Sequence, residues 1–327
     1  MKAYICRTLG MPDAHRVEEV PSPAAREGHV VVSVKAAGVN FPDTLMVQGK
    51  YQHTPPLPFI PGHEISGVIK EVGPGVKGYR PGDRVLAFMR HGGFGAFCEE
   101  SLVKADHFLT LLPDTVDYVS AAATPLAYGT AFHSLRKARI TGGETVLVLG
   151  ASGGVGMAAV QIAKLLGARV IACASSDEKL ALCARNGADE LVNYEVEDLR
   201  SAIRRLTGGR GVDIAVDPVG DRFAEPVVRG MAWNGRYCIV GFAGGQIPRI
   251  ALNLLLLKGC ELIGLGVGVN ADRDATEYTA NQRQMLDWMA AGKLQPIVTA
   301  RYPLAQAAEA LNAIMNRTVK GKVVLTL

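Results

Sequence analysis

The sequence has few cysteines, no long apolar run and little net charge. Its six cysteines form no C-x-x-C pair, so neither a zinc cluster nor a dithiol redox motif is indicated. The apolar run at 251–257 is too short to span a bilayer, and the chain starts without an apolar signal stretch. A net charge of +4, without a basic stripe, gives no argument for nucleic acid. We expect reduced thiols, a cytoplasmic location and neither membrane nor nucleic-acid partners.

Glycine is abundant, with 37 residues among 327, and the apolar residues follow two different rhythms. Up to residue 124, short β-rich runs, one of them at 97–99, are separated by turn signals at 73–75, 81–83 and 92–93, which predicts a barrel-like β domain. Over 125–266 strand-like runs, among them 169–174 and 212–216, alternate with helical ones such as 223–232, the pattern of a doubly wound parallel sheet. The tail, 267–327, is expected to return to the first domain. The sequence therefore predicts an α/β protein of two domains.

The second region centres on residues 145–179. A β-branched run at 145–150 is followed by a glycine turn at 151–156, a helical pattern and a second strand-like run. This unit has the length that binds half a dinucleotide, with Gly153 allowing the backbone to approach a pyrophosphate and Gly156 allowing close helix packing. We expect the phosphates beside Ser152, Gly153, Gly154 and Val155. The alternative is a tight strand–helix turn, since Ala151 replaces the first glycine of the usual fingerprint.

The end of the second strand indicates which dinucleotide binds. NAD sites usually carry an acid there, whereas this chain has Ser175 and Ser176, with Lys179 shortly after. Hydroxyls and a lysine suit a 2′-phosphate, and Tyr194 is expected near the same group, so the predicted cofactor is NADPH. The alternative is a helix N-cap formed by one of the serines, with Asp177 in the first turn.

Several motifs in order resemble the medium-chain dehydrogenase/reductase superfamily, and within it the zinc-free quinone oxidoreductases. The motifs are Ala37-Gly-Val-Asn-Phe-Pro-Asp43, Pro61-Gly-His-Glu64 with Gly67, Gly73-Pro-Gly-Val76, Gly82-Asp-Arg84, Gly150-Ala-Ser-Gly-Gly-Val-Gly-Met157 with Gln161, Val240-Gly-Phe-Ala-Gly-Gly245 and Gly321-Lys322. The resemblance covers nearly the whole chain. It implies a GroES-like catalytic domain (1–124 and 267–327), a Rossmann domain (125–266) and an active site between them. It also implies a homodimer or homotetramer joined through the last Rossmann strands, near 262–269.

Zinc dehydrogenases of this superfamily carry a Cys where this chain has Asn40, a His where it has His63, and a second Cys near Ala127. Only His63 matches, and one His beside Glu64 cannot complete a site with three protein ligands. We therefore expect no metal, which favours reduction of an already electrophilic acceptor. His63 is expected to be either a hydrogen-bonding cleft residue or a satisfied core histidine.

The resemblance also implies roles for individual residues. Asn40, Asp43 and Tyr51 are expected at the cleft wall, where the Asn40 amide and the Tyr51 hydroxyl donate to substrate oxygen and Asp43 orients its neighbours. The alternative for Asn40-Phe-Pro-Asp43 is turn chemistry. Thr130 is expected beside the nicotinamide, although a helical threonine can also bond to its own backbone.

Two further sites complete the expected cofactor pocket. Gly241, Phe242 and Ala243 follow a strand at the carboxyl edge of the sheet, where ligands bind, and are expected to line the nicotinamide pocket. Lys322 matches a family lysine near the cofactor phosphates; its alternative is an ordinary surface charge.

These features predict an NADPH-dependent, zinc-independent reductase of quinones or related α,β-unsaturated carbonyls, acting by hydride transfer. The nearest alternative is an enoyl-thioester or 2-alkenal reductase on the same fold. An alternative of another class is an NADPH-binding protein with a structural or RNA-binding role, and the weak, scattered positive charge argues against RNA.

Overall fold

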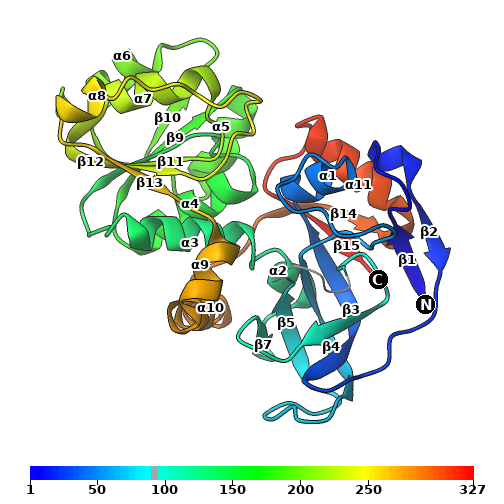
Figure 1. Ribbon diagram of the computed structural model, residues 1–327. Coiled ribbons are helices and arrows are strands. Elements are labelled where there is room, and N and C mark those ends of the chain that lie inside the picture. Colours follow the sequence, from blue (N-terminus) through cyan, green and yellow to red (C-terminus); the bar gives the residue numbers. More distant parts are fainter. Residues whose placement is uncertain (90–94) are drawn as a thin grey trace. The chain divides into compact units, whose positions relative to one another are not determined.

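The computed structural model describes residues 1–89 and 95–327 (Figure 1). The turn expected at 92–93 lies outside these residues. The described chain divides into two compact units, residues 1–127 with 271–327, and residues 128–270. The dividing points expected from the sequence were residues 124 and 266.

A seven-stranded sheet forms the first unit. Its strands, in spatial order, are β14 (Val298–Pro303), β15 (Lys322–Thr326), β3 (His29–Val39), β4 (Glu64–Val72), β5 (Arg84–Phe88) and β7 (Leu109–Leu111), with β6 (Glu100–Lys104) also paired to β3. All pairs are antiparallel except β14 with β15. The C-terminal strand therefore lies beside a strand that is almost 300 residues earlier in the chain, with Val323 opposite Val39.

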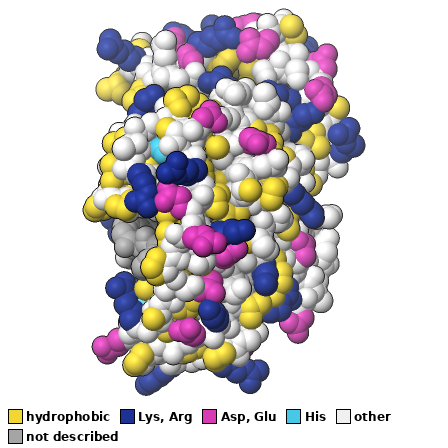
Figure 2. All heavy atoms as spheres, turned by 90° about the vertical axis from the view of Figure 1, so that its right-hand side faces the viewer, with side chains coloured by type: hydrophobic (Ala, Val, Ile, Leu, Met, Phe, Trp, Pro, Cys, Tyr) yellow, Lys and Arg dark blue, Asp and Glu magenta, His cyan; other side chains and the backbone are white. Residues whose placement is uncertain are grey.

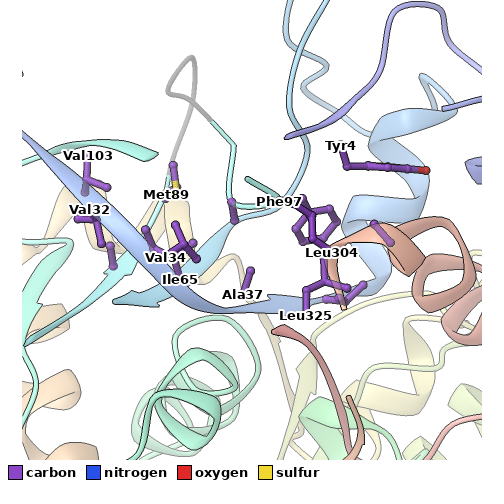
Figure 3. Close-up of a cluster of buried hydrophobic side chains, with 14 of the residues drawn as sticks. Tyr4, Val32, Val34, Ala37, Ile65, Met89, Phe97, Val103, Leu304 and Leu325 are labelled. Carbon is purple, nitrogen blue, oxygen red and sulfur yellow. The ribbon is translucent and has the colours of Figure 1, made fainter. Parts of the chain in front are cut away.

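The core of this unit is built on β3, most of whose side chains are buried. Val32 and Val34 pack with Ile65, Phe97 and Leu325 in one apolar cluster (Figure 3). A small two-stranded sheet, β1 (Lys2–Ile5) with β2 (Arg16–Glu19), adds Tyr4 to the same cluster. Helices α2 (Tyr118–Ala122), α10 (Ala275–Ala290) and α11 (Ala307–Met315) also belong to this unit.

Two segments of the first unit differ from what their sequence patterns indicate. Asn40 to Asp43 is the start of helix α1 (Phe41–Val47) rather than an isolated turn, because Asn40 occupies the N-cap, Pro42 the first turn and Asp43 the third helical position. The strand expected at 97–99 is a single bridge between Cys98 and Ala3. Backbone bonds of this segment are divided among β1, Pro61 and Val34 of β3, and regular pairing with β3 begins only at β6.

The second unit is a six-stranded parallel sheet, which confirms the predicted Rossmann class. The spatial order is β10 (Glu190–Asn193), β9 (Arg169–Ala174), β8 (Thr145–Val148), β11 (Val212–Asp217), β12 (Met231–Ile239) and β13 (Glu261–Gly264). All pairs are parallel. The order reverses between β8 and β11, and ligands of open sheets bind at the carboxyl ends beside such a reversal.

Helices cover both faces of this sheet. Figure 1 shows α3 (Ala127–Lys137) and α4 (Gly154–Leu165) on one face and α6 (Leu199–Leu206) and α7 (Ala224–Arg229) on the other. Helix α5 (Asp177–Arg185) links β9 to β10, and α8 (Asn253–Leu256) and α9 (Val267–Arg273) follow β12 and β13. The helix expected over 223–232 is shorter, because Gly230 closes α7 and β12 already starts at Met231.

The surface carries mixed charge. Figure 2 shows basic and acidic side chains interspersed on the face that it presents. Of the helices within residues 1–89 and 95–327, none combines the length and the apolar character that crossing a bilayer requires.

Candidate functional site

The glycine turn after β8 lies at the reversal of strand order. Gly150 has a φ of 55°, in the left-handed region that favours glycine, and a Cβ on it would lie 2.7 Å from Cγ2 of Val219. A Cβ on Gly156 would lie 2.2 Å from the Gly150 carbonyl oxygen. The two glycines therefore bring α4 into close contact with the turn and the turn into contact with the loop after β11.

Helix α4 begins at the predicted phosphate-binding residues. Gly153 is its N-cap, and Gly154 and Val155 form its first turn, with Ser152 buried just before them. The first N–H groups of a helix have no partner within the helix, and the positive end of the helix dipole lies there as well. This end of α4 can therefore bind an anion such as a pyrophosphate.

The end of β9 brings together the residues predicted to bind the 2′-phosphate. Lys179 Nζ lies 3.0 Å from Ser175 Oγ, so the ammonium group and the hydroxyl converge on one spot. Ser176 is the N-cap of α5, and its hydroxyl accepts a bond from the Lys179 backbone N–H at 3.4 Å. The capping alternative therefore holds for Ser176, while Ser175 and Lys179 form a separate pair. The Asp177 carboxylate accepts a bond from Asn193 Nδ2 at 2.9 Å.

Tyr194 belongs to a small aromatic group beyond the end of β10. Its ring packs on Phe223, with centroids 4.4 Å apart. The Arg222 guanidinium lies 4.9 Å from the centre of the Phe223 ring and also pairs with Glu195 at 2.7 Å. Sequence reasoning missed Arg222, which adds a cation to this aromatic group. Its only sequence signal is a position five residues after the last residue of β11.

The carboxyl end of β11 holds a buried carboxylate that the sequence analysis did not single out. Asp217 accepts bonds from the backbone N–H groups of Val219 and Gly220, both at 2.7 Å, and from the Tyr237 hydroxyl. Burial raises the pKa of Asp217 above its usual range, although these bonds oppose the rise. Asp217 thereby fixes the loop that carries Val219 against Gly150.

The residues expected to line the nicotinamide pocket lie beside this loop. The Gly241 N–H donates to the Asp217 carbonyl and the Ala243 N–H to the Pro218 carbonyl at 3.0 Å, which ties the end of β12 to the end of β11. The Phe242 side chain between them is exposed. Thr130 is buried on α3, where its carbonyl accepts a bond from Ser134 Oγ.

Three polar side chains of the first unit form a buried network. Lys322, only 3% exposed, donates to Asn40 Oδ1 at 2.5 Å and to Glu64 Oε1 at 2.7 Å, and Asn40 Nδ2 donates to the same Glu64 oxygen at 2.7 Å. The other Glu64 oxygen accepts the backbone N–H of Leu126 at 2.7 Å. The buried ammonium and carboxylate thus compensate each other.

This network bears on two predicted roles. The Lys322 ammonium has three N–H groups, and Asn40, Glu64 and the Val39 carbonyl, at 3.4 Å, supply three acceptors. Neither the phosphate role nor the surface alternative expected for Lys322 finds support in these contacts. Asn40 is also held at both ends of its amide, so its contacts within this unit are structural.

Asp43 joins this network to a second group. Its Oδ2 accepts the Asn40 backbone N–H at 2.8 Å, and its Oδ1 lies 2.5 Å from His63 Nδ1. The Tyr51 ring meets the His63 ring edge-on, with centroids 6.3 Å apart. Asp43 is fully buried, whereas the His63 side chain is 16% exposed. The orienting role expected for Asp43 agrees with this placement, and His63 is a hydrogen-bonded residue at the edge of the core.

No zinc site can be assembled from these donors. Among residues 1–89 and 95–327, no three His, Cys, Asp or Glu side chains are grouped so that they could hold a metal ion. Asn40 is bonded to Lys322 and Glu64, and His63 Nδ1 lies within hydrogen-bond distance of Asp43. A structural or catalytic zinc needs at least three protein ligands.

Two protein-family models match the chain. Residues 26–114 match the alcohol dehydrogenase GroES-like domain, and residues 154–290 match the domain described as zinc-binding dehydrogenase. The second description implies a zinc ion that the described residues do not fit.

Full-length relatives are more specific. The chain is 37% identical to quinone oxidoreductase-like protein 2 of Rattus norvegicus over 328 aligned positions, covering all of this chain and 92% of that protein. Escherichia coli quinone oxidoreductase, solved with NADPH, superposes on this chain with a TM-score of 0.92 at 28% identity. A mycobacterial protein solved with NADPH superposes with a TM-score of 0.92 at 31% identity. Both superpositions cover the full length of the two chains compared. The chain therefore belongs to the quinone oxidoreductases of the medium-chain dehydrogenase/reductase superfamily.

Proposed function

We propose that the protein is an NADPH-dependent, zinc-independent reductase of quinones or related α,β-unsaturated carbonyls. The observation that carries this proposal is the convergence of Lys179 and Ser175 at the end of β9, beside a glycine turn at the reversal of the parallel sheet. The E. coli and mycobacterial relatives solved with NADPH give further support. When bound, the cofactor supplies the hydride.

Residues of the second unit hold the cofactor in this proposal. The first N–H groups of α4, at Gly154 and Val155, bind the pyrophosphate together with Ser152 and Gly153. Ser175, Lys179 and Tyr194 bind the 2′-phosphate, and a charge-assisted bond from the Lys179 ammonium is the strongest contact of this set. The ends of β11 and β12, with Gly241, Phe242 and Ala243, line the nicotinamide pocket together with Thr130.

Residues of the first unit act on the acceptor. Hydride addition to a quinone or enone leaves negative charge on oxygen, which neutral hydrogen-bond donors stabilise. Tyr51 donates its hydroxyl to that oxygen. Asn40 and Asp43 hold the start of α1 and the His63 ring in place.

A substrate panel tests the proposal. NADPH oxidation is measured with quinones, enones, enals and enoyl thioesters, with NADH as the matched cofactor control. We expect turnover of quinones or enones with a clear preference for NADPH. A higher kcat/KM for enoyl thioesters or enals would assign the protein to the alternative reductase class. Tight NADPH binding without oxidation by any acceptor would refute a catalytic role. Salt-sensitive binding of an RNA probe would favour the RNA-binding alternative, although the face in Figure 2 has basic and acidic side chains interspersed.

The proposed partner of the second unit is another copy of the same chain. β13 is the edge strand of the parallel sheet, and Leu252, Leu256 and Leu257, on and beside α8, are 75%, 81% and 65% exposed. An unpaired edge next to exposed leucines suits a homodimer or homotetramer. Light scattering should give twice or four times 34.7 kDa. Leu256→Asp should lower this mass, while Val196→Asp, an equally exposed site, should not. A monomeric wild-type protein would contradict the assembly.

A further inference from the structure

The first unit contains a pocket that shares no residue with the site described above. Its volume is about 400 Å³, which lies within the range of about 300–1,000 Å³ that is usual for small-molecule sites. The wall comes from the β6–β7 loop and from helix α10, and the residues that form it are His107, Ala275, Thr276, Thr279, Ala280 and Arg283. None of these residues has a role in the proposed reaction.

One face of α10 forms most of this wall. Residues 275, 279 and 283 are four positions apart, and 276 and 280 lie beside them, so all five share one side of the helix. The buried residues of α10, such as Tyr278 and Met285, belong to an adjoining face. Thr276, Ala280 and Arg283 are exposed, so a ligand can reach the pocket from solvent.

The polar side chains of this wall are unused by the fold. Within residues 1–89 and 95–327, Thr276, Thr279 and Arg283 form no side-chain hydrogen bond or ion pair. Threonines elsewhere in the chain differ, since Thr44 Oγ1 donates to the Phe41 carbonyl and Thr207 Oγ1 to the Ile203 carbonyl, both at 2.7 Å. Two hydroxyls and one guanidinium are therefore available to a ligand in the same pocket.

His107 supplies the part of the wall that does not come from α10. Its ring packs on Phe108, with centroids 4.0 Å apart, and meets the Tyr278 ring edge-on at 6.1 Å. Its Nε2 is buried and has no hydrogen-bond partner in the part of the chain that the structure describes. A buried polar nitrogen without a partner costs free energy. A ligand group that pairs with this nitrogen, after a small turn of the ring, would recover that free energy.

We infer that this pocket binds a small phosphate monoester. The inference does not rest on the proposed function, because the pocket uses other residues. A bidentate pair with the Arg283 guanidinium occupies two oxygens of an anion. A carboxylate would then have no further oxygen, whereas a phosphate monoester keeps a third terminal oxygen for the hydroxyls of Thr276 and Thr279. Ala275, Ala280 and the threonine methyl groups offer an apolar wall to the organic part of the ligand.

The charges around the pocket make direct contact decisive. Asp287 lies one turn beyond Arg283 on α10, Glu277 lies in the first turn of this helix, and Asp106 precedes His107 in the chain. These carboxylates oppose the approach of an anion, so the general field of this surface gives no attraction. The affinity must therefore depend on the bonds to Arg283 and the two hydroxyls.

Calorimetric titration of the full-length protein tests this site with phenyl phosphate, inorganic phosphate and benzoate. All proteins carry Lys179→Ala, because a phosphate can also bind at the proposed cofactor site. Phenyl phosphate should bind more tightly than the other two. Arg283→Gln should raise its Kd by about 10-fold or more, and Thr279→Val by about threefold. Arg273→Gln removes an exposed arginine outside the pocket and should change the Kd by less than about twofold.

The outcomes separate this inference from its alternatives. Because Arg283 is exposed, its variant should keep the wild-type unfolding temperature. Phenyl phosphate that shows no saturable binding, or that binds equally to the Arg283→Gln and Arg273→Gln proteins, would overturn the site. Benzoate that binds as tightly as phenyl phosphate would overturn the phosphate class. NADPH oxidation by the Arg283→Gln protein should match wild type, so a failure of the proposed function would appear in the substrate panel alone.

Discussion

The choice between NADPH and NADH depends in our proposal on one ammonium group. Lys179 is the third residue of α5, where the positive end of the helix dipole disfavours a cation by about 0.3–1 kcal/mol. Its Nζ has a hydroxyl neighbour, Ser175, at 3.0 Å. The Lys179 ammonium therefore contributes little to the stability of the fold. A bound phosphate would offset the unfavourable interaction of this charge with the helix dipole.

The change to test is Lys179→Ala. A hydrogen bond to a charged group contributes about 1.5–3 kcal/mol, so the Kd for NADPH should rise by about 10- to 100-fold. The Kd for NADH should change by less than about twofold, because that cofactor lacks the 2′-phosphate. The free energy of unfolding should stay within about 0.5 kcal/mol of wild type, since the residue is on the surface of a helix.

Calorimetric titration with each cofactor measures both constants. Lys179→Arg should keep the preference for NADPH, because the positive charge remains. Lys164→Ala is the matched control, since this lysine of α4 already pairs with Asp189 at 2.8 Å. An equal loss of affinity for NADPH and NADH in Lys179→Ala would refute the 2′-phosphate role.

Four further results are expected. Tyr51→Phe should slow enone turnover about 10-fold or more and leave NADPH affinity intact, and unchanged steady-state turnover would remove Tyr51 as a donor. Gly156→Ala should destabilise the protein by about 1–3 kcal/mol in denaturant titration, since its Cβ would lie 2.2 Å from a backbone oxygen, whereas Gly153→Ala meets an ordinary 3.4 Å contact. Because the pKa of Asp217 is raised in the folded protein, its protonated form stabilises the fold at low pH, and this stability is lost as pH rises through the folded-state pKa. The unfolding free energy of Asp217→Asn should therefore increase relative to that of wild type from pH 4 to 7. A difference that stays constant with pH would contradict this. Metal analysis should find well under one zinc per chain, and stoichiometric zinc would overturn the ligand argument.

The parallel sheet was readable from the sequence because its signals are local. Strand β9 matches its predicted run, Arg169–Ala174, and β11 extends the predicted run by one residue, because buried parallel strands are continuous apolar segments between glycine turns. Sequence reasoning also brought Ser175 and Lys179 to one place, since both flank the same strand end. These features need no knowledge of distant parts of the chain.

The first unit was harder to predict because its decisive contacts are distant in sequence. Lys322 and Glu64 are 258 positions apart, and only the pairing of β15 with β3 brings them together. No local pattern distinguishes such a buried lysine from a surface one. The turn alternative for the start of α1 arises because the Asn, Pro and Asp of a helix start also favour turns. The hydrogen-bonding partner of His63 could not be named from the sequence for the same reason, since Asp43 lies on a different element.

The bond between Glu64 and the Leu126 backbone has a consequence for how the chain passes between its two units. Leu126 immediately precedes α3, whose first residue ends one unit and whose remaining residues begin the other. Glu64 Oε2 therefore holds the backbone just before α3, while Glu64 Oε1 holds the C-terminal strand through Lys322. Loss of that single acid would remove both restraints together, so a substitution at residue 64 would loosen the segment before α3 and the C-terminal strand at the same time.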